Sequence, residues 1–162
     1  MRMRPDRPQG HLLLVVRERG VTVARRQGTN MVLRAGATLI AQLFAGAGGA
    51  KAIDTVGIGF ATEPGGAEAT ALTAPPASAN IPPSALRTAL TADAFQVVTD
   101  QPGVVQVKIA PVFAPTQELT DVTEAGLLSG TTLYNQVIFE PVALHVGQSV
   151  TFFWQIDFPF GH

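Results

Sequence analysis

Hydrophobic and polar residues alternate most clearly near the end of the chain, over residues 149–158. The apolar positions are Val150, Phe152, Trp154, Ile156 and Phe158. Polar residues fill most of the positions between them, and Phe153 is the one apolar exception. Because successive side chains of a strand point to opposite sides, this pattern predicts a strand with one buried face. An aromatic ring buries about 150–250 Å², so we expect this strand to cross the centre of the core.

Shorter apolar or alternating segments predict further strands. They lie at residues 12–16, 21–24, 53–60, 86–90, 95–99, 104–112 and 133–139. Residues 119–127 fit neither period cleanly, and we interpret them as a short strand or an irregular crossing segment. Many short strands separated by Gly- and Pro-rich turns are typical of a sandwich or barrel. We therefore predict a mainly β fold, an antiparallel, jelly-roll-like β-sandwich of about eight strands.

One segment, near residues 30–46, predicts an α-helix. Its apolar residues recur at helical spacing and are Val32, Leu33, Leu39, Ile40, Leu43 and Phe44. Thr29 or Asn30 would cap its start, and Gly46 would end it. Gly36 inside the helix costs about 1 kcal/mol relative to alanine, which indicates a close approach to a sheet.

The predicted core joins this helix to the strands. In it, Trp154 packs with Leu43, Ile138, Phe152 and Ile156. A chain of 162 residues has the length of one ordinary domain, so we expect a single β-sandwich domain over residues 11–162. Residues 1–10 are rich in Arg and Pro and predict an extended N-terminal arm. Residues 62–84 predict a long loop, and loops of this length are usually functional or contact segments.

The charge composition favours an assembling protein. Charged residues make up 14% of the chain, against a typical share of about 25%. Buried intersubunit surface explains this deficit, and a poorly soluble monomer is the alternative. Residues 1–34 carry a net charge of +6 and the remaining residues −7. Arg2, Arg4 and Arg7 are therefore candidate partner contacts, on an acidic neighbouring subunit.

Two other interpretations of the basic segment stay open, a nucleic-acid arm and a solvated face. No aromatic residue is interleaved with these arginines, which disfavours single-stranded nucleic acid. Three aromatic residues also leave a choice open. Phe153, Tyr134 and Phe139 fit either a protein interface or a core covered on both sides.

No catalytic constellation stands out, and we predict a non-enzymatic protein without catalytic, metal-binding or cofactor-binding residues and without a small-molecule substrate. The three histidines lie far apart in the sequence, outside the spacing of a local metal motif. Asp121 and Glu124 form the closest carboxylate pair, and we interpret them as turn or exposed-face residues. The apolar runs fall far below the roughly 18 residues of a membrane span, so we predict no span and no signal peptide.

Several segments, taken in order, resemble a family of small tailed-bacteriophage virion proteins, the tail or tail-fibre-like proteins. Asn30 with Gly36 and the apolar residues that follow is similar to the opening helix of that family. Residues 53–60 are like its Ile-x-x-Ile-x-x-Gly strand, and Leu119-Thr120 with residues 123–127 resemble its Ile-Thr-Glu-Ala-Gly-Leu element. Residues 132–142 and 150–156 resemble its last two strands, although Gln136 stands where arginine is common.

The resemblance implies a structural component of a phage virion, namely a tail, collar or fibre-attachment protein. Its partners would be copies of itself, with a trimer favoured, and other virion proteins. Two alternatives are a head decoration or cement protein of the capsid and a receptor- or carbohydrate-binding module of the tail. The family has no settled catalytic residues, so none is transferred to this chain.

Overall fold

The computed structural model describes residues 9–161, and these residues form a mainly β fold with one α-helix. One half of the sheet contains β1 (Gln9–Glu18), β2 (Val21–Val32), β5 (Phe95–Val98), β6 (Val104–Ile109), β7 (Val112–Phe113) and β11 (Gln148–Pro159). The other half contains β3 (Thr55–Gly59), β4 (Arg87–Ala89), β8 (Leu119–Ser129), β9 (Thr132–Leu133) and β10 (Asn135–Leu144). The helix α1 (Arg34–Ala45) follows β2, and short 3-10 helices lie in the connections, η1 (Ala77–Ala79), η2 (Pro83–Leu86) and η3 (Ala92–Ala94).

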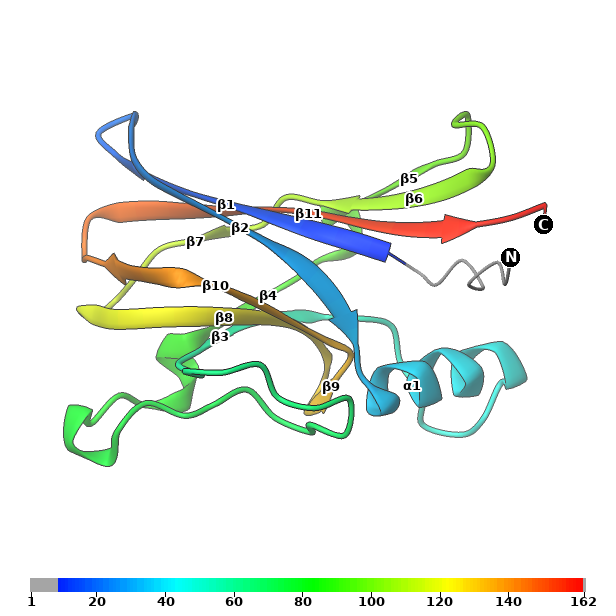
Figure 1. The fold of residues 1–162 in the computed structure, drawn as a ribbon, viewed down its shortest axis with the longest axis horizontal. Coiled ribbons are helices and arrows are strands. Elements are labelled where there is room, and N and C mark those ends of the chain that lie inside the picture. Colours follow the sequence, from blue (N-terminus) through cyan, green and yellow to red (C-terminus); the bar gives the residue numbers. More distant parts are fainter. Residues whose placement is uncertain (1–8, 162) are drawn as a thin grey trace, which may run out of the picture.

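The strands form a single antiparallel sheet that curls into two layers (Figure 1). Their order is β4-β3-β8-β10-β2-β1-β11-β6-β5, with β7 paired to β11 and β9 to β8. Strand β2 joins the layers, because residues 21–29 pair with β1 and residues 30–32 with β10. The mainly β class is therefore confirmed. One curled sheet of 11 strands takes the place of the expected pair of sheets with about eight.

Several strands are longer than the alternation predicts. Strand β1 begins at Gln9, so the last two residues of the expected arm belong to the sheet, where they pair with Asp157 and Ile156 of β11. Strand β8 is a continuous strand of 11 residues between β3 and β10, where we expected a short or irregular segment. From Val122 to Ser129 every residue of β8 is buried, so both faces of the strand are covered. Apolar and polar residues therefore do not alternate along it as they do in a strand with one exposed face.

The hairpin of β1 and β2 turns at Arg19 and Gly20, between two segments that the hydrophobic pattern predicts as strands. Arg19 and Gly20 both have positive φ, 51° and 81°. A two-residue turn with positive φ at both central positions matches the twist of the flanking strands. The tip of this hairpin lies at one end of the molecule (Figure 1).

The core lies between the two layers of the sheet. Trp154 pairs with Leu12 of β1 and Ile109 of β6, and Phe152 pairs with Leu14. Phe152, Trp154 and Ile156 are buried together, in one cluster with residues of β8 and β10. In β10 it is Val137 and Phe139 that enter this cluster, whereas Ile138 is half-buried on the other side of the strand. The expected contact of Ile138 with Trp154 is therefore wrong, because the residues of β10 that point into the core here are Val137 and Phe139, its two neighbours in the chain.

The expected place of Leu43 in the core is also wrong, since Leu43 is 39% exposed. The helix starts at Arg34 rather than near residue 30, because residues 30–32 hydrogen-bond to β10 as the end of β2. Leu33 takes the N-cap position without a side-chain cap, so the expected cap from Thr29 or Asn30 is absent. Only Gly36 and Leu39 of α1 are buried, and Gly46 ends the helix in a left-handed conformation (φ 64°).

Replacing Gly36 with alanine is expected to destabilise the fold by about 1–3 kcal/mol, as overpacking does. An added Cβ would come closer than 3.0 Å to the backbone carbonyl of Tyr134. At an exposed helix position the same exchange stabilises by about 1 kcal/mol, so the sign is diagnostic. Urea unfolding measures it, with Ala41→Gly on the exposed side of α1 as the control for propensity alone. A Gly36→Ala chain more stable than the parent would refute the close contact.

Candidate functional site

A groove of about 880 Å³ lies between the long loop and the outer side of the layer containing β8 and β10. The loop contributes Pro75, Pro76, Ser78, Ala79 and Ile81, and the start of the loop contributes Phe60, Ala61 and Thr62. The sheet contributes Gln27, Glu118, Thr120, Asp121, Thr123, Ile138, Phe139, Glu140 and Pro141. The groove therefore combines apolar walls with three carboxylates.

Two irregularities in the pairing of β8 with β10 place two of these carboxylates, Glu140 and Asp121. Ile138 pairs with Glu124 and Val142 with Val122, so β10 has three residues between its paired positions where β8 has one. The extra residues include Pro141, which has no N–H to donate to a ladder. The guanidinium of Arg26 donates instead to the carbonyl oxygens of Glu140, at 3.0 Å, and Pro141, at 2.8 Å. The bulge thus directs the stretch around Glu140 outward and ties it to β2.

The second irregularity lies on β8. Val142 pairs with Val122 and Leu144 with Leu119, so β8 now has the extra residue. Asp121 lies within it and has a left-handed backbone, with φ 59°. Aspartate tolerates this conformation better than most residues, and bulges commonly redirect a side chain. Asp121 and Glu140 are both exposed in the groove, and neither has an ion-pair partner among residues 9–161.

Glu118 lies at the end of the groove and pairs with Nδ1 of His145. The N–H of Val146 also donates to the Glu118 carboxylate, at 3.4 Å. The hydrogen bond from His145 lowers the pKa of Glu118 below its ordinary value, so this carboxylate keeps its negative charge to lower pH. The groove therefore ends on a charge that is hydrogen-bonded and oriented.

A buried carboxylate holds the loop against the sheet. Glu124 is 0% exposed, and its two oxygens accept hydrogen bonds from the backbone N–H of Thr73 and from Nε2 of Gln136, the latter at 2.7 Å. Gln136 in turn accepts the N–H of Gly65 at 3.2 Å. Gly59 is needed beneath this cluster, because an added Cβ would come closer than 3.0 Å to the Glu124 side chain. One wall of the groove is thus anchored at two points through Glu124 and Gln136.

Further contacts fix both ends of the same loop segment. Thr123 donates to the carbonyl oxygen of Ala61, and the N–H of Phe60 donates to Thr73 at 3.0 Å. At the start of α1, the N–H of Arg34 donates to Ala67 at 2.8 Å, and its side chain pairs with Glu68 at 3.3 Å. The loop therefore connects the helix, β3 and β8, and a second cavity of about 680 Å³ lies behind it.

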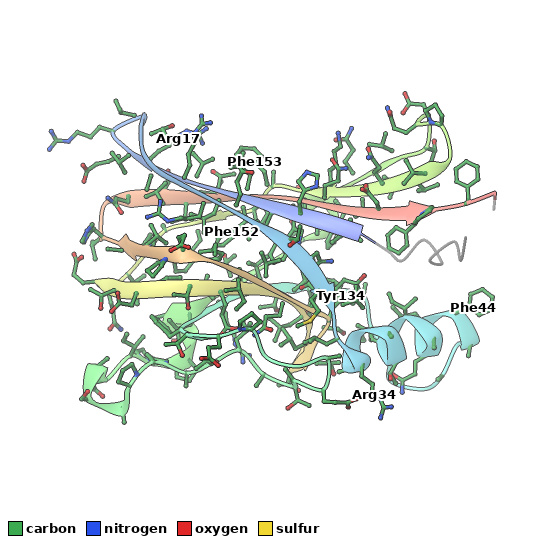
Figure 2. The ribbon with its side chains drawn as sticks, in the orientation of Figure 1. Arg17, Arg34, Phe44, Tyr134, Phe152 and Phe153 are labelled. Atoms are coloured by element: carbon green, nitrogen blue, oxygen red, sulfur yellow. The ribbon has the colours of Figure 1, made fainter. Side chains whose placement is uncertain are left out.

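The helix α1 presents a second candidate surface. Ile40, Leu43 and Phe44 lie at helical spacing on its exposed side, with exposures of 41%, 39% and 96%. Figure 2 shows Phe44 at the far end of the helix, whereas Tyr134 lies at the helix start. No residue among 9–161 covers this stripe.

The sequence left open whether three aromatic residues belong to a protein interface or to the core, and the structure places them in different environments. Tyr134 and Phe139 are buried in the main cluster, so they belong to the core. Phe153 is 40% exposed on the outer side of β11, opposite to Phe152 (Figure 2). Burial raises the pKa of the Tyr134 hydroxyl. Of the three, only Phe153 is placed for contact with a partner.

The arginines predicted as partner contacts lie outside the described part, and two further polar residues, Ser129 and Asp54, have structural contacts. Arg2, Arg4 and Arg7 belong to residues 1–8, which lie outside the described residues. The hydroxyl of Ser129 donates to Lys51, and Asp54 accepts the N–H of Gly130. Within residues 9–161, no group of three or more His, Cys, Asp or Glu side chains could hold a metal ion. No helix in the same range has the length and apolarity to cross a membrane.

Sequence reasoning missed the role of Glu124, which it assigned to a turn or exposed face. A glutamate between apolar residues of a strand is the available signal, because a carboxylate in such a run must be hydrogen-bonded if it is buried. The bulges at Asp121 and Glu140 had no comparable signal apart from Pro141. A scan of protein-family models, a search of curated proteins and a search of solved structures each found no match to this chain.

Proposed function

We propose that the protein is a non-enzymatic structural subunit of a phage virion, in the tail, collar or fibre-attachment region, and that it assembles through contacts with other copies and other virion proteins. The observation that carries this proposal is the uncovered apolar side of α1. A phenylalanine that is 96% exposed beside two half-exposed aliphatic residues leaves apolar surface in water, which is unfavourable in free energy. Such a stripe is typical of a surface that a partner covers.

The charge composition supports the same proposal. Only 14% of the residues are charged, and the chain keeps apolar residues exposed on the strands as well, at Val97, Val112 and Phe153. A subunit with part of its surface buried against neighbours needs fewer charges for solubility than a free monomer does. Copies of the chain are the simplest partners, with a trimer favoured.

A second candidate function is a receptor- or carbohydrate-binding module, and the groove favours it. Phe60 and Ile138 line the groove together with polar groups, and convergent apolar and polar groups are usual in ligand sites. Titration of the isolated protein with neutral oligosaccharides, followed by amide chemical shifts, tests this candidate. Shifts confined to residues of the groove would favour it over a purely structural role.

Replacing Phe44 with serine is expected to weaken self-association by about tenfold or more, since burying such a side chain contributes about 1.5–3 kcal/mol. Sedimentation velocity over a range of concentrations measures the change. The control is Val21→Ser, which removes an exposed apolar side chain from β2, outside this stripe. A parent chain that stays monomeric at all concentrations, and that is not recovered with virions, would contradict the proposal.

A further inference from the structure

The groove beside β8 and β10 carries more negative charge than the surrounding residues neutralise. Glu118, Asp121 and Glu140 line it, and none of the lining residues is Lys or Arg. Arg26 is the cation that reaches this stretch of β10. Each of its three guanidinium nitrogens donates to a carbonyl oxygen, of Arg25, Glu140 or Pro141, and none of them to a carboxylate among residues 9–161. Asp121 and Glu140 therefore keep free acceptor oxygens within an accessible groove.

The walls of the groove suit an extended peptide that carries long cationic side chains. Prolines 75 and 76 and Ile81 form one side, and Ile138 forms part of the other. The aliphatic stem of an arginine packs on apolar walls while its guanidinium reaches a carboxylate. The planar guanidinium can also donate two hydrogen bonds to one carboxylate, which a lysine cannot do.

The chain itself supplies a segment with this chemistry. Residues 1–8 contain Arg2, Arg4 and Arg7 against one acidic residue, Asp6. Eight extended residues span up to about 28 Å, which is enough to cross from one subunit to the next. We propose that the groove receives residues 1–8 of a second copy of the chain, with arginines paired to Asp121 and Glu140.

The direction of β1 favours a neighbouring copy over the same copy. In Figure 1, β1 begins toward the end of the molecule where α1 lies, whereas the start of β8 and the end of β10 lie at the opposite end. A chain that continues backward from Gln9 along β1 moves away from its own groove. Docking from one copy to the next is then a head-to-tail contact, which closes into a ring or continues as a filament.

This inference rests on the proposed function, because it names the partner and the contact by which the subunits join. It is nevertheless tested independently of α1. A direct binding measurement uses a fluorescent peptide with the sequence of residues 1–8 and the full chain with Arg2→Gln, Arg4→Gln and Arg7→Gln, whose own arm no longer competes. Fluorescence anisotropy measures the dissociation constant.

The matched groove variant adds Asp121→Asn and Glu140→Gln to this chain, since asparagine also accepts the left-handed backbone. We expect the peptide to bind about tenfold more weakly or worse, as the loss of several charge pairs predicts. Raising the salt from about 50 to 500 mM should weaken binding to the intact groove and change little in the variant. Glu18→Gln with Asp100→Asn, two carboxylates outside the groove, is the control and should leave the affinity unchanged.

Chemical-shift mapping of the same peptide on the chain with the intact groove guards against a misfolded variant. Shifts at residues 120–123 and 138–141 support the inference. Shifts confined to other surfaces, an affinity unchanged by the groove variant, or no binding of the peptide would each overturn it.

A mixing experiment separates neighbours from self-docking. The chain with a neutral arm keeps an intact groove, and the chain with a neutral groove keeps an intact arm. If the arm docks on a neighbour, the mixture forms a complex in sedimentation that neither variant forms alone. A mixture that behaves as the sum of its components, while the peptide binds, would show docking within one copy and would overturn the inference. Self-association through α1 that is as strong with both arm and groove neutral as in the parent chain would leave the proposed function standing and reject this contact.

Discussion

Replacing Trp154 with alanine is expected to lower the free energy of unfolding by about 3–5 kcal/mol, as large-to-small core changes at aromatic residues do. Trp154 is 1% exposed and lies between Leu12 and Ile109 in the layer containing β1, β11 and β6. It faces the buried residues of β8 and β10. The loss is comparable to the lower end of the whole stability of a small domain, about 5 kcal/mol. Urea unfolding followed by far-UV circular dichroism measures it.

Two other substitutions make this measurement specific. Trp154→Phe keeps a ring and also removes an indole N–H that has no hydrogen-bond partner among the described residues. An unpaired buried donor costs about 1–3 kcal/mol, so this exchange should cost less than half of the alanine substitution. Phe153→Ala changes the neighbouring residue on the outer side of β11, where the ring is 40% exposed, and should change stability little. A Trp154→Ala chain as stable as the parent would refute the assignment of the inner face.

The inner face of β11 could be predicted because that face is buried from Val150 to Ile156, whereas the other face, except for Thr151, stays partly exposed. Val150, Phe152, Trp154 and Ile156 keep strict alternation, and all four are buried. The same reasoning failed by one residue in β10, because the long loop covers the outer side of that strand. When both faces are covered, burial no longer follows period two, and the phase of the strand cannot be read from hydrophobicity alone.

The helix shows a different limit of the sequence. Val32 and Leu33 continue the apolar spacing of α1 backward, although Val32 pairs with Asn135 in β10 and Leu33 is the N-cap. Local periodicity cannot tell whether the backbone of these residues bonds to the next turn of a helix or to a strand more than 100 positions away. For the same reason the sequence predicts Leu43 in the core. Its spacing from Leu39 fits one apolar face of a helix, but the pattern does not show which part of that face the sheet covers.

The groove is the part of the molecule that the sequence predicted least. The prolines and glycines of residues 62–84 predict the loop that forms one wall. The other wall contains two bulges, which arise only when β8 and β10 pair. Glu124 is the clearest case. Its burial follows from the approach of Thr73 and Gln136, which lie 51 and 12 positions away in the chain.

Replacing Glu124 with alanine is expected to release the loop segment around residues 65–73 from the sheet. The change leaves the N–H of Thr73 and Nε2 of Gln136 without acceptors, at a cost of about 1–3 kcal/mol for each donor. Because the loop lies at the surface, its donors can reach water once it lifts, so the loss appears chiefly as local opening. Amide hydrogen exchange at Thr73 and Gly65 should therefore accelerate by at least about thirtyfold, the equivalent of about 2 kcal/mol.

Glu124→Gln is the informative intermediate, because it keeps the shape of the side chain and changes one acceptor into a donor. Three hydrogen bonds form a chain here. The N–H of Thr73 and Nε2 of Gln136 each donate to an oxygen of residue 124, and the side-chain oxygen of Gln136 accepts the N–H of Gly65. With glutamine at 124, one donor faces another whichever way either amide is turned, so a single conflict of about 1–3 kcal/mol remains. Exchange at Thr73 and Gly65 should then fall between the parent and Glu124→Ala, while the slowest amides of β11 stay unchanged. Equal exchange in the parent and in Glu124→Gln would show that an amide serves as well as the carboxylate, and that the loop is held by its other contacts.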